Sequence, residues 1–254
     1  MRGRSPLLFA AALLIVALGA PVASLLFSVT PAGAIAAFGA ADIAPAIVTS
    51  VLASAIAVAI ALVLGVPTGY LVARARGTGR AIFMFAFALP LVFPPIAAGV
   101  MLLSVVGNRQ PLGAWLVAHG IVIVDRLGGV VLAEFFSCAP FVVIASAAAF
   151  GEVDRRLEEA AQTLGAGPLR VFTRIAVPLA APGIIAGALL AWLRALGEYG
   201  ATSVLAYHPT SLPIALYIAL SADGLQRALS IAYIFAALAA CIVIAQAFVR
   251  RRPF

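Results

Sequence analysis

Residues 44–72 read APAIVTSVLASAIAVAIALVLGVPTGYLV, a stretch without a charged side chain. A helix needs about 20 mainly apolar residues to cross the hydrocarbon core of a bilayer, and this stretch exceeds that length. Five other stretches are of the same kind. The six predicted spans are Leu7–Val29, Ala44–Val72, Ala81–Val106, Gly128–Phe150, Val177–Gly200 and Ala228–Val249. The sequence therefore predicts an all-α membrane protein, a bundle of six transmembrane helices.

The overall composition agrees with a chain that lies in lipid. Apolar residues make up 65% of the 254 residues and charged residues 10%, whereas about half and about a quarter are usual in soluble domains. The net charge of +7 comes from arginines clustered between the apolar stretches, which favours a membrane surface over nucleic acid as the partner. Cys138 and Cys241 lie inside apolar stretches, so we expect two small buried side chains and no disulfide or metal site.

The arginines also predict the orientation of the bundle, because cytoplasmic loops of membrane proteins carry the excess of positive charge. One set of helix ends holds Arg2, Arg4, Arg74, Arg76, Arg80, Arg155, Arg156, Arg170, Arg174, Arg250, Arg251 and Arg252. The opposite ends hold only Arg109, Arg126 and Arg227. We therefore expect both termini in the cytoplasm.

The first apolar stretch has two interpretations. It follows Arg2 and Arg4, as a secretory signal does, but it continues to Val29 without a clean A-x-A cleavage site, so we favour a retained helix. This divides the chain into residues 1–43, a first transmembrane helix with its outer loop, and residues 44–250, the main transmembrane domain. Leu112–Val124 is apolar but too short to span, and we expect an outer or re-entrant helix there.

The longest predicted cytoplasmic loop, Gly151–Arg174, has the pattern of a surface helix–turn–helix. Good helix formers fill Glu152–Leu164, Gly165 follows as a stop signal, and Pro168 suits the first position of a second helix. Apolar residues recur at helical spacing along the first helix. They are Val153, Leu157, Ala160, Ala161 and Leu164. We expect this stripe to dock on a soluble partner.

This loop also resembles a known motif. Glu159-Ala160-Ala161, Gly165, Ile175 and Val177-Pro178 resemble the EAA loop of bacterial importer permeases of the ATP-binding cassette class, with Val177 where leucine is usual. The resemblance covers residues 152–178 and implies a type I importer fold with a cytoplasmic coupling helix. It implies that Glu159, Ala160, Ala161 and Gly165 couple the bundle to a separate ATPase subunit. In agreement, the sequence has no phosphate-binding G-x-x-x-x-G-K-[ST] loop.

Two spans contain residues that are typical of a transport pathway. Pro90, Pro94 and Pro95 interrupt the third span, and in lipid a broken helix tends to face a cavity because its freed carbonyls need partners. Arg194 and Glu198 are four residues apart in the fifth span, where charges are expensive unless paired. We expect an outer gate here that also includes Gly200 and Thr202, although a kink and an ion pair without a transport role remain alternatives.

These stretches narrow the resemblance. LPLVFPP at 89–95, RALGEYGAT at 194–202 and SLPIALY at 211–217 are similar to segments of molybdate permeases and of the closely similar sulfate and tungstate permeases. Only Tyr207–Thr210 fills the following outer loop, which is as short as in iron(III) and thiamine permeases. The resemblance implies a multi-pass protein of the bacterial cytoplasmic membrane that imports an oxyanion, molybdate first. The other solutes stay alternatives.

The resemblance also implies the partners: two ATP-binding cassette subunits inside, a substrate-binding protein outside and a second permease copy. No cofactor, metal or nucleic acid is expected, and the loop residues His119 and His208 are not interpreted as ligands. Two other functions remain. A gradient-driven secondary transporter would use Glu198 as its proton carrier, and an intramembrane enzyme would have only Arg194, Glu198 and Glu134 for its chemistry.

Overall fold

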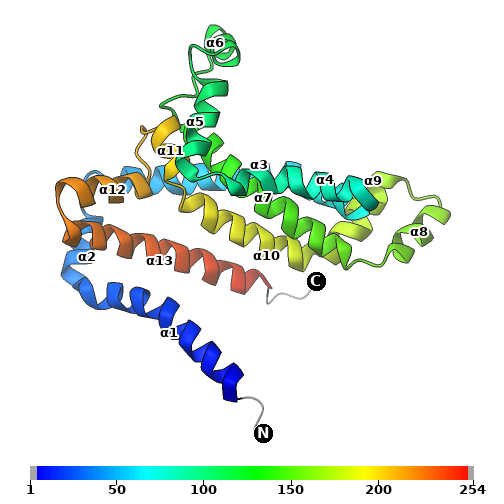
Figure 1. The fold of residues 1–254 in the computed structure, drawn as a ribbon, viewed down its shortest axis with the longest axis horizontal. Helices are drawn as coiled ribbons and strands as arrows, with labels where there is room; N and C mark the ends of the chain where they lie inside the picture. Colours follow the sequence, from blue (N-terminus) through cyan, green and yellow to red (C-terminus); the bar gives the residue numbers. More distant parts are fainter. Residues whose placement is uncertain (1–4, 251–254) are drawn as a thin grey trace.

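The computed structural model describes residues 5–250, and in that range every regular element is helical. Figure 1 shows long helices running lengthwise, with short helices at the two ends and a pair of short helices rising from one side. The elements are α1 (Ser5–Ser28), α2 (Pro31–Phe38), α3 (Ile43–Arg74), α4 (Gly77–Ala88), η1 (Leu89–Val92), α5 (Pro95–Val106), α6 (Pro111–Ala118), α7 (Leu127–Gly151), α8 (Arg155–Thr163), α9 (Pro168–Val171), η2 (Phe172–Ala176), α10 (Val177–Leu196), α11 (Gly200–Leu205), α12 (Leu212–Ala222) and α13 (Leu225–Arg250).

The predicted membrane bundle is confirmed. Within the described residues, five helices are long and apolar enough to cross a bilayer, and there are six spans if the bent α4–α5 pair is counted as one. The sequence-based boundaries lie close to the observed ones for five of the six spans. Arg2, Arg4, Arg251 and Arg252, which entered the prediction of orientation, lie outside the described residues.

The centre of the bundle is formed by α3, α7 and α10, and α3 with α7 makes the most extensive helix pair. Small residues at the crossing let the two backbones approach. A Cβ built on Gly69 would lie 2.6 Å from the Cβ of Ser146, and one on Gly65 would lie 3.0 Å from a methyl carbon of Val142. The core therefore depends on close backbone contact more than on large side chains.

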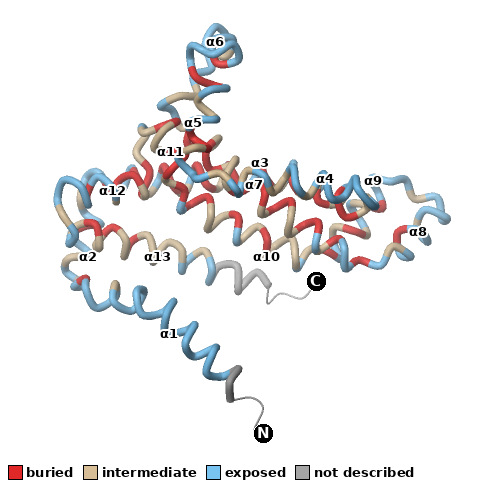
Figure 2. The backbone as a smooth tube through the Cα atoms, viewed as in Figure 1, coloured by how far each residue is buried: buried red, intermediate tan, exposed pale blue. Residues whose placement is uncertain are grey.

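The outer helix α13 contacts α10 on one side of this centre, and α1 contacts α13. Figure 2 shows α1 exposed along its described length, and α13 is only partly buried. Cys138 is buried as expected, but the expectation was wrong for Cys241, which is exposed. The residue lies on α13, where an apolar side chain that faces away from the other helices meets lipid rather than a protein core.

The third span is broken at its prolines, as the sequence predicted. The Gly77–Val92 part and the Pro95–Val106 part meet at an angle of 106°. Figure 1 shows α5 leaving the bundle and carrying α6 at its far end, so α6 is the short outer helix expected within Leu112–Val124. The break gives the bundle an irregular side, with η1 at its centre.

The fifth span ends earlier than predicted. We expected a helix over Val177–Gly200, but α10 ends at Leu196 and the separate short helix α11 starts at Gly200. Glu198 therefore lies in the break between the two helices, not within a spanning helix. The sequence analysis also missed α12, an apolar helix too short to span that follows the Tyr207–Thr210 loop.

Candidate functional site

The breaks in the third and fifth spans face a common cavity of about 270 Å³. Its walls come from η1, α5, α7, the last turn of α10 and α11. The lining residues are Pro90, Leu91, Phe93, Pro95, Ala98, Phe136, Ser137, Phe141, Arg194, Glu198 and Ala201. Two interruptions far apart in the sequence thus build one partly polar cavity beside the bundle core.

Glu198 holds the polar side of this cavity together. Its carboxylate is 1% exposed and pairs with the Arg194 guanidinium at 2.6 Å. The same carboxylate accepts hydrogen bonds from the Ser137 hydroxyl at 2.8 Å and from the Ala201 backbone N–H at 2.8 Å. It therefore satisfies a donor in the first turn of α11 and links α7, α10 and α11. The predicted meeting of Arg194 and Glu198 is confirmed.

Gly200 brings α11 against the broken span. A Cβ on Gly200 would lie 2.5 Å from the Cβ of Pro95 and 2.9 Å from the backbone nitrogen of Ile96. Only glycine allows this approach without displacing backbone atoms. The sequence-based grouping of Pro95 with Gly200 is therefore matched by direct packing.

The predicted pathway residues divide into two groups. Pro90, Pro95, Arg194 and Glu198 line the cavity, whereas Pro94, Gly200 and Thr202 are not among its lining residues. Pro94 is exposed just before α5, and Thr202 is fully buried with no hydrogen-bond partner for its hydroxyl among the described residues.

Glu134 on α7, which the sequence analysis considered together with Arg194 and Glu198, is also buried. Its Oε2 has no hydrogen-bond partner in the part of the chain that the structure describes. Among those residues no group of three or more His, Cys, Asp or Glu side chains is placed to hold a metal ion.

The second candidate site is α8, which Figure 1 shows projecting at one end of the bundle. The helix is shorter than the predicted Glu152–Leu164 because Asp154 caps it, accepting from the Arg156 backbone N–H at 3.0 Å. Gly165 turns the chain in the left-handed region with φ of +86°, where glycine is favoured. After the predicted restart at Pro168, α9 continues through η2 into α10.

The expected apolar stripe is mostly exposed. Val153 is buried against the bundle, but Leu157 is 49% and Leu164 is 89% exposed. Leu169, in the following helix, is also exposed. Glu159 and Ala160 are exposed and Ala161 is partly buried. Exposed leucines beside charged residues at the tip of a segment are typical of a surface that another protein covers.

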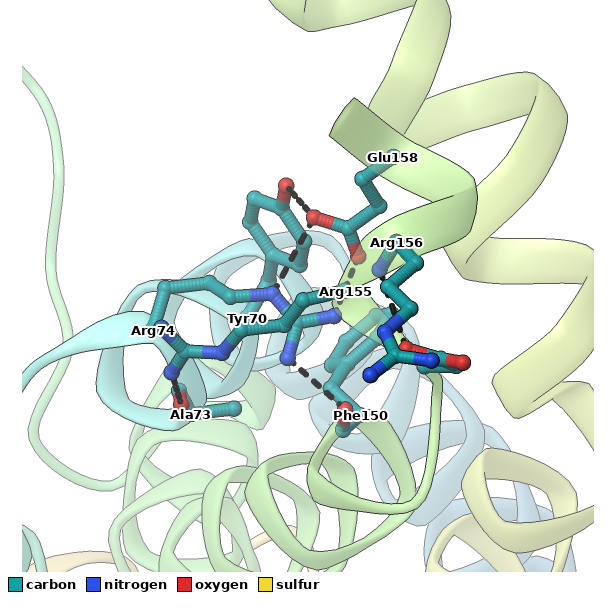
Figure 3. A network of polar contacts seen from close by, with 8 residues as sticks. Tyr70, Ala73, Arg74, Phe150, Arg155, Arg156 and Glu158 are labelled. Carbon is teal, nitrogen blue, oxygen red and sulfur yellow. Dashed lines mark hydrogen bonds and ion pairs between the residues drawn. The ribbon is translucent and has the colours of Figure 1, made fainter. Parts of the chain in front are cut away.

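The opposite face of α8 is tied to the bundle through Glu158, a contact that the sequence analysis missed (Figure 3). Glu158 is 5% exposed, accepts a hydrogen bond from the Tyr70 hydroxyl at 2.9 Å and forms an ion pair with Arg74. Arg74 also donates to the backbone oxygen of Phe150 at 2.9 Å, and Arg155 donates to that of Ala73 at 3.0 Å. These contacts join α8 to the ends of α3 and α7.

Two opposing effects act on the pKa of Glu158. Burial raises the pKa, but hydrogen bonds from Arg74 and Tyr70, together with the nearby guanidinium charges, outweigh it, and the pKa lies below its ordinary 4.5. A carboxylate with a lowered folded-state pKa stabilises fully above its unfolded value and loses this effect as the pH falls through the folded-state pKa. The contact is therefore complete at neutral pH.

We predict that α8 stays attached to the bundle from neutral pH down to the ordinary pKa of glutamate. A nitroxide at exposed Gln162 (Gln162→Cys, with Cys138 and Cys241 replaced by alanine) should keep its mobility over that range and gain mobility only below pH 4.5. With Glu158→Gln added, the acid-induced change should disappear. A rise in mobility between pH 7 and pH 5 would contradict the prediction.

Residues 65–253 of this chain match the protein family described as "Binding-protein-dependent transport system inner membrane component". A probable molybdenum ABC transporter permease of Haloferax volcanii is 35% identical over 219 residues, covering 86% of this chain and 80% of the relative. The molybdenum transport system permease ModB of Escherichia coli K12 is 36% identical, with 70% of this chain and 80% of ModB covered.

Solved structures of other transporters have the same fold. A chain of a bacterial ABC transporter that imports alginate superposes with a TM-score of 0.74 at 18% identity, covering 98% of this chain and 94% of that one. A chain of the MetNI methionine ABC transporter in an inward-facing conformation gives 0.65 at 16% identity, covering 80% and 92%. At such identities the likeness concerns the fold alone, and it agrees with the predicted type I importer architecture.

Proposed function

The chain belongs to the family of binding-protein-dependent transport system inner membrane components, and from this premise we propose that it is the membrane-spanning permease of an ATP-driven oxyanion importer, with molybdate as the solute. The observation that supports this most directly is α8. It is a short helix with exposed leucines in it and beside it, attached to α3 by a partly buried ion pair. A surface of this kind is suited to receive force from a soluble partner.

The partner that we propose for α8 is a separate ATPase subunit in the cytoplasm. Glu159, Ala160, Ala161 and Gly165 lie in or directly after α8 and supply exposed charge, small side chains and the turn. With a second permease copy, two ATPase subunits would dock, and a substrate-binding protein would deliver the ion at the opposite end. Both termini then lie in the cytoplasm, as the arginine distribution predicts. ATP hydrolysis belongs to the docked subunits.

The pathway that we propose passes the cavity at the broken spans. Pro90, Pro95, Arg194 and Glu198 line it, and Pro94, Gly200 and Thr202 lie at or beside the breaks, with Gly200 packed against Pro95. Leu91, Val92 and Ile96 are exposed at the same break. A second copy of this chain covering that side would enclose the route between the two subunits. Because Arg194 and Glu198 neutralise each other, the cavity wall carries little net charge. A wall of this kind would bind an anion only weakly, as a transport pathway requires.

Molybdate is proposed as the solute because the relatives named for molybdenum cover most of this chain at 35% and 36% identity. A relative in Thermococcus kodakarensis, 33% identical, is named for both molybdate and tungstate. Tungstate and sulfate therefore serve as the first competitors, and iron(III) and thiamine as the more distant ones.

The test is uptake into proteoliposomes that contain the permease, its ATPase subunit and its binding protein. We expect labelled molybdate to accumulate only with ATP inside and binding protein outside. Tungstate should compete best, sulfate less, and iron(III) and thiamine not at all. Uptake that survives ATP depletion but collapses with the proton gradient would instead favour the gradient-driven transporter.

We further predict that Glu159→Arg detaches the ATPase subunit. Reversing an exposed charge on the docking face places like charges together, so retention of the ATPase in a pull-down should fall about tenfold or more, with uptake falling in parallel. Glu152→Arg is the matched control, because Glu152 is an exposed acid just outside α8. Retention of the ATPase by the Glu159 variant at the level of the Glu152 variant would count against α8 as the docking site.

A further inference from the structure

A cluster of polar side chains, one buried and two partly buried, fixes α8 to the bundle and takes no part in the exposed docking face. It consists of Glu158 on α8 with Tyr70 and Arg74 at the end of α3 (Figure 3). We propose that these three residues form a clamp that transmits the movement of α8 to α3 and α7, and that coupling of ATP hydrolysis to uptake fails without it. The proposal rests on the proposed function of the chain as an importer permease.

The first step of the argument is that α8 cannot hold its place without such a contact. It has nine residues, and isolated helices shorter than about 12–15 residues are marginal in water. Its closest packing is with α9 and η2, which are themselves short. Leu157, the leucine within α8, is 49% exposed, and Leu164, directly after the helix, is 89% exposed. The polar contacts of Glu158 and Arg155 are thus its main attachment to the long helices.

The second step is that the clamp has more than one point of contact. Arg74 binds both Glu158 and the Phe150 backbone oxygen at the end of α7, so one guanidinium joins three helices. Arg155 adds a bond from α8 to the Ala73 backbone oxygen. The Arg74 guanidinium also lies 5.2 Å from the centre of the Tyr70 ring. Arg74 of α3 bonds to α8 and α7, and Arg155 of α8 bonds to α3. We therefore expect that α8 cannot shift without moving the ends of α3 and α7.

The third step is that α3 and α7 lead from the clamp to the cavity. α7 extends from Phe150 to Ser137, about 20 Å at 1.5 Å per residue, and Ser137 donates to the Glu198 carboxylate. On α3, the Ser54 hydroxyl accepts from the Trp192 indole N–H of α10 at 3.0 Å. A Cβ on Gly69 of α3 would lie 2.9 Å from the Ala147 backbone nitrogen and 3.0 Å from the Val143 backbone oxygen of α7, so we expect the two helices to move as one unit. The clamp therefore lies at one end of a continuous set of contacts with the gate at the other.

Glu158 and Glu159 then have different roles although they are neighbours. Glu159 is exposed and suited to contact the ATPase, whereas Glu158 is buried and bonds to Tyr70 and Arg74. Glu158, Arg74 and Tyr70 are positioning residues. Their loss should leave the ATPase bound and active but reduce the number of ions imported per ATP hydrolysed.

The experiment uses proteoliposomes with the complete transporter and measures phosphate release and molybdate uptake together. For Glu158→Gln we expect ATPase retention and ATP hydrolysis within about twofold of the parent and ions per ATP reduced about tenfold, a typical size for the coupling between two sites. Glu152→Gln, which removes an exposed acid nearby, should change none of the three values. A purely structural role would lower the amount of transporter without changing ions per ATP.

Two results would overturn the clamp. One is normal ions per ATP in Glu158→Gln. The other is loss of the ATPase subunit from that variant, as expected for Glu159→Arg, because Glu158 would then be a docking residue. If Glu158→Gln does not reach the membrane, Tyr70→Phe decides instead. It removes one hydrogen bond, and unchanged ions per ATP would reject the clamp while a severalfold decrease would support it. Failure of the parent to import molybdate with ATP would instead reject the proposed function.

Discussion

Arg194→Met should lower the melting temperature of the detergent-purified permease by about 6–12 °C. The variant leaves the Glu198 carboxylate, 1% exposed, without its cation. Removing one partner of a buried ion pair typically costs about 3–5 kcal/mol. For chains of this size each kcal/mol shifts the melting temperature by about 2–4 °C. The expected decrease of about 6–12 °C corresponds to the smaller cost, about 3 kcal/mol. Melting followed by size-exclusion chromatography of heated samples measures the change.

The two halves of the pair should not be equivalent. The Arg194 side chain is 32% exposed at the cavity, so water can solvate it when Glu198 is removed. Glutamine at position 198 keeps one oxygen that can accept from the Ala201 N–H, and its amide group can donate to the Ser137 hydroxyl. Glu198→Gln should therefore cost clearly less than Arg194→Met, and the double variant should melt above Arg194→Met alone, because it no longer buries a lone charge.

Arg109→Met is the matched control, because Arg109 is exposed and its replacement removes a positive charge without breaking an ion pair identified in the described residues. Its melting temperature should equal that of the parent. If Arg194→Met has the same melting temperature as the Arg109→Met control, the Arg194–Glu198 pair does not hold α10, α11 and α7 together as described. The same variants test the alternative function: a proton carrier at position 198 would lose all gradient-driven uptake in Glu198→Gln, whereas ATP-driven uptake should persist.

The spans could be predicted because a membrane imposes a length and a composition on any helix that crosses it. Ala44–Val72 and Gly128–Phe150 differ from α3 and α7 only near their ends. The breaks in the third and fifth spans were not equally predictable from the sequence. Three prolines identified the one at η1, but Gly200 was interpreted as part of the gate within a continuous helix, and the end of α10 at Leu196 was not foreseen.

The candidate sites were only partly predictable, for two physical reasons. Arg194 and Glu198 were paired correctly because they are one helical turn apart, a distance that sequence spacing reports. Glu158 and Arg74 are 84 positions apart, and nothing in the spacing joins them. The apolar stripe was expected to face a partner and is mostly exposed, but nothing in the helical pattern distinguished Glu158, which is buried, from its exposed neighbour Glu159. A surface built for a partner reverses the usual rule that apolar residues lie inside.

Gly69→Leu should have a large effect on the bundle: folded permease in the membrane should fall about tenfold or more. A Cβ at this position would lie 2.6 Å from the Ser146 Cβ and 2.9 Å from the Ala147 backbone nitrogen, so the first carbon already meets backbone. Overpacking typically costs about 1–3 kcal/mol and sometimes more, and α3 cannot move away without opening the main helix pair of the bundle. Quantitative immunoblotting of membranes, with melting of the purified remainder, measures the loss.

A compensating pair of substitutions separates this crossing from a general intolerance of α3. Gly69→Ala adds only the Cβ and should be destabilising, and Ser146→Gly removes the side-chain atom nearest to it. The double variant should recover part of the loss, because the buried Ser146 hydroxyl has no hydrogen-bond partner among the described residues to forfeit. Gly79→Leu is the control, since a Cβ there meets no atom within 4 Å, and leucine favours a helix. Gly65 and Gly69 have the G-x-x-x-G spacing of close helix crossings. Normal levels of Gly69→Leu would mean that α3 and α7 are not in backbone contact in the membrane, and the clamp would then have no rigid unit to move.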